Sequence, residues 1–149
     1  MSLISEATCI FCQIGAGTAP ARTFYEDEDI LGFVNHTPVH PGECLLIPKS
    51  HINHFMDIDD ELAARIMQLG QRLCRRIRAQ LHPGRVGYVV AGYSVPHAHL
   101  LVLPSHHAHD ITCEHFAVQQ AGKIVFTDEH IPMAPRAELD RMAALLRLA

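Results

Sequence analysis

Residues 95–104 read VPHAHLLVLP, an apolar stretch with two histidines one residue apart. Successive side chains of a β-strand point to opposite faces, so His97, His99 and Leu101 are expected on one face and the residues between them on the other. Pro96 has no N–H group to give to a sheet, so we expect the strand to begin at about His97. The pattern predicts one apolar face against the core and one face whose histidines line a surface or cleft.

The segments on both sides of this strand predict an α+β fold with an antiparallel sheet. Runs of strand type precede and follow one long helical pattern, and this order differs from the alternation of βαβ units. Besides residues 98–103, the predicted strands are residues 22–26, 30–34, 44–47 and 86–90.

One long helix is predicted over residues 59–81, and a short amphipathic helix over residues 135–148. Asp57 or Asp59 can cap the N-terminus of the long helix. Its apolar residues recur every three or four positions and form a single stripe, namely Leu62, Ile66, Leu69, Leu73 and Ile77.

Size and charge exclude several classes of function. Of 149 residues, 48% are hydrophobic and 19% charged, so residues 1–149 are predicted to form one domain. A net charge of −4 provides no positive field to attract nucleic acid. No apolar run approaches the roughly 20 residues that cross a bilayer, and the N-terminus lacks a signal-peptide pattern. We therefore expect a cytoplasmic protein that binds neither nucleic acid nor membranes.

The loop before the histidines is suited to phosphate. Gly92 and Ser94 lie in it, and a small flexible loop with a hydroxyl and exposed amide groups can hold a phosphate oxygen. An isolated pair of alternating histidines has a simpler alternative, two ordinary half-buried strand residues.

Four segments distinguish between these readings. CIFCQI at 9–14, YEDEDILGFVN at 25–35, PGECLLIPKSH at 41–51 and AGYSVPHAHLLVLP at 91–104 have the order and approximate spacing of the histidine triad superfamily. The chain resembles this superfamily over most of its length. The resemblance implies a histidine triad-like domain, usually a homodimer, that hydrolyses or transfers nucleotides from phosphoramidates or dinucleoside polyphosphates. A purine nucleotide conjugate is the expected substrate.

The resemblance also assigns roles. His99 matches the middle histidine, the nucleophile that forms a covalent nucleotidyl-histidine intermediate, and His97 matches the first histidine of the motif. A neutral imidazole nitrogen is a competent nucleophile near neutral pH when a backbone carbonyl holds the other ring nitrogen as a donor. Ser94 matches a hydroxyl that contacts phosphate, and the Val95 amide is positioned likewise.

Four positions match the nucleoside pocket. Phe33, Phe11 and Ile14 match the walls around the base. Asn35 stands where the superfamily usually has an aspartate that accepts the two ribose hydroxyls, and an uncharged amide oxygen makes a weaker bond there.

Leu101 stands in place of the third histidine, which donates to phosphate in the transition state. Removal of one such donor typically lowers turnover by about 10²–10³. Three hypotheses follow: a slow enzyme that uses His99, a nucleotide-binding or interaction module with little turnover, and a hydrolase whose histidines hold a catalytic metal.

Cys9 and Cys12 have the spacing of half a zinc site, and a structural zinc ion needs two further ligands. On the motif alone, unligated thiols are the alternative, and a redox pair is disfavoured because no βαβ pattern surrounds it. Some bacterial histidine triad proteins bind zinc through such a pair, the histidine after Pro-Lys and the first histidine of the strand motif. The resemblance therefore implies a structural zinc ion held by Cys9, Cys12, His51 and His97.

Other histidines are less informative. His54 lies close to His51 in the sequence, so it competes as a ligand. The group of His106, His107 and His109 beside Asp110 is interpreted as a solvated loop. The irregular residues 105–134 are expected to line one side of the pocket.

Overall fold

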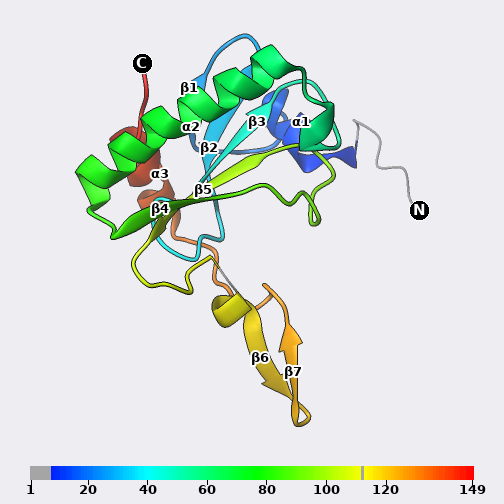
Figure 1. Ribbon diagram of the computed structural model, residues 1–149, viewed down its shortest axis with the longest axis vertical. Coiled ribbons are helices and arrows are strands. Elements are labelled where there is room, and N and C mark those ends of the chain that lie inside the picture. Colours follow the sequence, from blue (N-terminus) through cyan, green and yellow to red (C-terminus); the bar gives the residue numbers. More distant parts are fainter. Residues whose placement is uncertain (1–7, 112) are drawn as a thin grey trace.

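A five-stranded antiparallel sheet forms the centre of the computed structural model, which describes residues 8–111 and 113–149 (Figure 1). The strands lie in the order β1 (Thr23–Glu26), β2 (Ile30–Val34), β3 (Cys44–Pro48), β5 (Leu100–Ser105) and β4 (Arg85–Val89). Each neighbouring pair is antiparallel. The predicted α+β class with an antiparallel sheet is confirmed.

The long helix α2 (Asp60–Leu81) lies along one face of this sheet (Figure 1). A short 3₁₀ turn, η2 (Phe55–Asp57), precedes it. Asp59 is the N-cap, and its carboxylate accepts a hydrogen bond from the Leu62 amide at 2.9 Å. His82 ends the helix in the left-handed conformation, with φ 51°. The predicted helix is confirmed, and its stripe is buried at Ile66, Leu69, Leu73 and Ile77.

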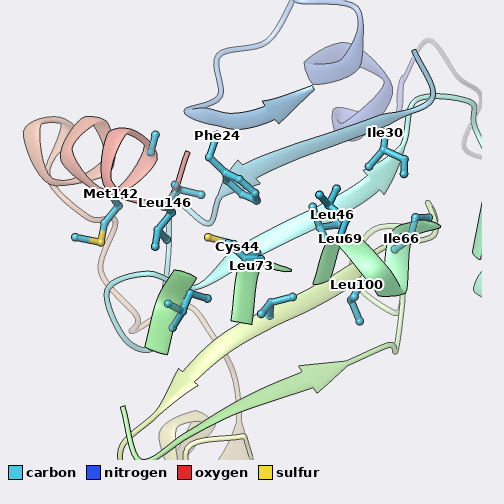
Figure 2. Packing of buried hydrophobic residues seen from close by; sticks show 14 of the residues in the cluster. Phe24, Ile30, Cys44, Leu46, Ile66, Leu69, Leu73, Leu100, Met142 and Leu146 are labelled. Atoms are coloured by element: carbon cyan, nitrogen blue, oxygen red, sulfur yellow. The ribbon is translucent and has the colours of Figure 1, made fainter. Parts of the chain in front are cut away.

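The C-terminal helix α3 (Arg136–Leu145) packs on the same face, against β1 and β2. Figure 2 shows Met142 and Leu146 near Phe24, with side chains of α2 over the middle of the sheet. These residues belong to one large cluster that forms the main core. No helix in the described part of the chain is both long and apolar enough to cross a membrane.

The opposite face of the sheet carries a smaller apolar cluster beneath the short helix α1 (Ile10–Gly15). Strand alternation divides each strand between the two faces. In β5, Leu100 and Val102 belong to the main core, whereas Leu101 packs against the smaller cluster. The predicted division of faces is correct here. The buried members of the smaller cluster are Cys9, Phe11, Leu31, Phe33, Leu45 and Ile47.

The start of β5 differs from the prediction, because the strand begins at Leu100 and not at about His97. The His97 amide donates to Val95, and the Ala98 amide donates to Ile52, so both groups bond outside the ladder with β3. The carbonyl of Pro48, at the end of β3, accepts from the His97 ring at 2.8 Å. The pairing of β3 with β5 therefore stops at Leu100.

Residues 113–126 contain a separate unit of structure. A 3₁₀ turn, η3 (Cys113–Phe116), leads into a hairpin of β6 (Ala117–Gln120) and β7 (Lys123–Phe126). Ala121 and Gly122 have φ of 47° and 77°, as a two-residue hairpin turn requires. The hairpin projects from the end of the molecule remote from α1 (Figure 1). The expectation that residues 105–134 line one side of the nucleotide pocket stays a prediction.

Candidate active site and metal centre

His99 is half-buried on the α1 face of the sheet. Its Nδ1 atom lies 2.7 Å from the carbonyl oxygen of His97. A carbonyl oxygen only accepts hydrogen bonds, so Nδ1 carries the ring proton and Nε2 carries the lone pair. The Phe11 ring packs edge-on against this imidazole, with centroids 5.3 Å apart. The second nitrogen of His99 is thus in the form that can attack an electrophile.

His97 is fully buried, at 0% exposure, so the expectation that both histidines face a surface or cleft is wrong for this residue. Its Nε2–H donates to the Pro48 carbonyl at 2.8 Å, which leaves the lone pair on Nδ1. Burial lowers the pKa of His97. The hydrogen bond to Pro48 raises this pKa, whereas the neighbouring His51 and His99 lower it, and the net shift is downward. The ring is therefore neutral at pH 7 and aims Nδ1 at the two N-terminal cysteines.

Cys9, Cys12, His51 and His97 form one cluster whose ligand atoms all lie within 4.8 Å of one another. The His97 Nδ1 atom is 3.5 Å from each Sγ atom, and His51 Nδ1 is 3.2 Å from the Cys12 Sγ. In a tetrahedral zinc site, with Zn–S about 2.3 Å and Zn–N about 2.05 Å, sulfur and nitrogen are about 3.6 Å apart. The donor types and spacing therefore fit zinc.

A cavity of about 540 Å³ opens beside this cluster. Cys12, Lys49, Ser50 and His51 are among its lining residues, and His99 is not. Lys49 also forms an ion pair with Glu26 at 2.7 Å. The cavity thus adjoins the cysteine–histidine cluster, and Lys49 forms part of its wall.

The loop before His97 is open to solvent at its centre. Gly92 has φ 72°, a conformation that favours glycine, and Ser94 is exposed. Val95 packs against the smaller cluster and accepts the His97 amide at 2.8 Å. The structure therefore brings Val95 to the α1 face and places the Ser94 hydroxyl at the surface.

The residues predicted to line the base pocket lie together, but their side chains pack against one another. The rings of Phe11 and Phe33 meet edge to face at 5.6 Å, and both side chains are buried. Ile14 packs on the same cluster, as does Leu101. Leu101 contributes only a hydrocarbon side chain on the face that carries His99.

Asn35 is held by a partner that sequence reasoning missed. Its Nδ2 group donates to the Glu43 carboxylate at 2.6 Å, and its Oδ1 accepts from the Thr37 amide at 3.3 Å. Glu43 is only 4% exposed, and burial raises its pKa despite hydrogen bonds from Asn35 and the Val39 amide. The signal in the sequence was the position of Glu43, an acidic residue directly before the apolar run at 44–47, where a buried carboxylate needs a hydrogen-bond partner.

An α+β domain with a tautomer-locked histidine and an adjacent Cys₂His₂ cluster defines a histidine triad-like protein. The profile of the HIT domain matches residues 16–108. This chain belongs to the HIT family, as its motifs predicted.

Individual relatives and solved structures with similar sequences agree with this family assignment. Protein hit of Bacillus subtilis is 37% identical over 101 residues, which span 64% of this chain and 70% of the relative. A zinc-bound histidine triad family protein from Mycobacterium smegmatis has a TM-score of 0.69 and 28% identity, over 96% of this chain and 93% of that chain. A HIT family hydrolase from Legionella pneumophila has a TM-score of 0.53 and 32% identity, over 64% of this chain and 90% of that chain.

Proposed function

We propose that this protein cleaves a nucleotidyl phosphoramidate or dinucleoside polyphosphate through a covalent intermediate on His99. The observation that carries the proposal is the 2.7 Å hydrogen bond between His99 Nδ1 and the His97 carbonyl, which leaves the lone pair on Nε2. Membership of the HIT family, which includes a relative named as a hydrolase, supports it.

The reaction proceeds in two displacements. The Nε2 atom of His99 attacks the α-phosphorus, the bond to the leaving group breaks as that group takes a proton from solvent, and a nucleotidyl-imidazole forms. Water then attacks phosphorus and gives a proton back to solvent, the P–N bond breaks, and nucleoside monophosphate leaves. The His97 carbonyl stabilises the positive ring of the intermediate through the Nδ1–H bond. Ser94 and the Val95 amide are the proposed phosphate contacts.

Nucleoside binding requires two side-chain movements in this scheme. Phe11 and Phe33 must separate to admit a purine between them and Ile14. The side chain of Asn35 must turn its Oδ1 atom from the Thr37 amide toward a ribose hydroxyl. We therefore expect binding to be weaker than in a pocket that is already open.

The test uses adenosine phosphoramidate as substrate and intact-protein mass spectrometry under single-turnover conditions. The parent protein should release AMP and carry a transient adenylyl group on His99. His99→Ala should do neither, whereas His54→Ala, which changes an exposed histidine, should match the parent. AMP release by His99→Ala at the parent rate contradicts the mechanism.

A nucleotide-binding module with little turnover is the second candidate. The hydrocarbon side chain of Leu101 favours it, because this side chain cannot donate to phosphate in the transition state. In that case calorimetry should detect AMP binding, and no adduct should form on His99.

We also propose that Cys9, Cys12, His51 and His97 hold a structural zinc ion, which when bound would link the N-terminal segment to the strand that carries His99. Their spacing supports this assignment, and so does the His97 tautomer, which has its proton on Nε2 and its lone pair on Nδ1. A catalytic metal would make a different prediction. Its removal would abolish turnover in a protein that stays folded, whereas removal of a structural ion should unfold the region.

A further inference from the structure

A second cluster of metal-capable side chains lies outside the site described above. His40 comes from the connection between β2 and β3, Asp110 from the loop after β5, and His115 from η3. One nitrogen or oxygen atom of each residue lies within 4.8 Å of the others. Two chain segments that are distant in sequence, one with His40 and one with Asp110 and His115, therefore meet at one point.

Asp110 organises this cluster. Its side chain is buried, and its Oδ2 atom accepts the amides of His106 and His107 at 2.6 and 2.8 Å. Its Oδ1 atom lies 3.0 Å from His115 Nε2. Burial would raise the pKa of Asp110, but the hydrogen bonds from the His107 and His106 amides and from His115, together with the adjacent His40 ring, lower it well below its usual range. The group is therefore a carboxylate, as a metal ligand must be.

His40 Nε2 has an unusual position. It is a buried atom 3.0 Å from Asp110 Oδ2, yet within the described residues it makes no hydrogen bond of acceptable geometry. The two amides already occupy that oxygen. A buried polar atom without a hydrogen bond is unfavourable and calls for a partner. A cation beside the carboxylate would coordinate this nitrogen.

The spacing agrees with shared coordination. Two ligand atoms, each about 2.1 Å from one ion, are about 3.0 Å apart at right angles and about 3.4 Å apart at the tetrahedral angle. His40 Nε2 and His115 Nε2 each lie 3.0 Å from an oxygen of Asp110. Each imidazole can carry its proton on Nδ1, which frees Nε2 for the ion.

We propose that His40, Asp110 and His115 form a second divalent-metal site, which takes Zn²⁺ and is separate from the Cys₂His₂ cluster. Imidazole nitrogen and carboxylate oxygen are zinc ligands, and three protein ligands leave a position for water. The site does not depend on the proposed catalysis by His99.

An ion at this site would link the β6–β7 hairpin to the main sheet. His115 lies in η3, which leads into β6, and its carbonyl accepts from His130 Nε2, beyond β7, at 2.6 Å. His40 belongs to the segment that leads into β3 at the centre of the sheet. An ion at this point ties both ends of the β6–β7 hairpin to the main sheet.

The experiment counts bound metal in metal-stripped full-length protein titrated with Zn²⁺. The parent should bind a second equivalent that Cys12→Ser retains and His40→Ala loses. His115→Gln, which keeps a polar side chain, should also lose it if His40→Ala folds poorly. His107→Ala is the matched control, since His107 bonds to Asp110 through its backbone amide and carbonyl, which alanine keeps, and the variant should bind as the parent does.

Cobalt separates the two sites by their ligands. Thiolates give Co²⁺ an intense charge-transfer absorption, and a site of imidazole and carboxylate gives only weak visible bands. The Cys12→Ser protein should therefore show the weak bands alone, and His40→Ala should weaken that binding by at least about 10–100-fold. The proposal is overturned if Cys12→Ser binds no metal or if His40→Ala and His115→Gln bind as much as the parent.

Discussion

His97 connects the metal centre with the proposed nucleophile. Its Nδ1 atom faces the two cysteines, its Nε2–H donates to Pro48, and its backbone carbonyl accepts the Nδ1–H of His99. The ring and carbonyl of one residue thus set the orientation of a candidate ligand and the tautomer of a candidate nucleophile. A change at His97 should therefore affect both features together.

Leu101 provides the most direct test of catalytic competence. Leu101→His places a ring donor on the His99 face, and we expect adenosine phosphoramidate turnover to rise by about 10²–10³. Leu101→Met is the matched control, because it keeps a similar volume without a donor. Equal rates for all three proteins would favour the binding module.

Asp27 should make stability depend on pH. Burial would raise its pKa, but hydrogen bonds from Tyr25, from the Ile30 and Asp29 amides and from Arg65 lower it below the ordinary 3.8. A carboxyl with a lowered pKa in the folded state stabilises the protein above the unfolded pKa, and this contribution is lost as pH falls through the folded value.

Asp27→Asn should therefore lower the free energy of unfolding by about 1–2 kcal/mol at pH 7. The difference between parent and variant should shrink as pH falls below the ordinary 3.8. Urea denaturation at several pH values measures it. A difference that stays constant down to pH of about 2 would contradict the assignment.

At the scale of elements, α2 and the strand alternation divide the molecule into two faces. The apolar stripe of α2 covers the main core, as Figure 2 shows, and Leu101 of β5 packs on the face of α1. This division places Leu101 and His99 on the side of α1.

Leu73 lies in the middle of the stripe and is fully buried. Leu73→Ala should lower the free energy of unfolding by about 2–5 kcal/mol, because it leaves a cavity in the main core. Met67→Ala truncates an exposed apolar side chain of the same helix and should have a much smaller effect. Comparable urea midpoints for the two variants would place the core elsewhere.

The zinc proposal belongs to the whole molecule, since its ligands come from before α1, within α1, after β3 and before β5. Cys12→Ser should lower the melting temperature and remove the charge-transfer band of the cobalt protein. Cys74→Ser is the control, since serine keeps the hydrogen bond to Tyr88. Equal melting temperatures would argue against a structural ion.

The homodimer and the cytoplasmic location expected from the sequence stay predictions. Sedimentation velocity measures the first, and a species with the mass of one chain at working concentration would contradict it. Residues of the hairpin offer a surface for such contacts, since Ile124 and Phe126 are exposed.

The sequence by itself determined the class of fold, the long helix and the division of faces. These features follow from periodicity and local sterics, which act over a few residues. The candidate residues of the site came from the resemblance to the histidine triad superfamily. Sequence reasoning failed at the β6–β7 hairpin, whose only turn signal was Ala121–Gly122.

Only the tertiary structure decided how His97 is buried, that Glu43 engages Asn35, and that His40, Asp110 and His115 meet. His97 and Pro48 are 49 residues apart, and their contact ends the pairing of β5 with β3. Such contacts depend on the path of the whole chain and on which polar groups are left to satisfy one another inside it, and no local pattern encodes either.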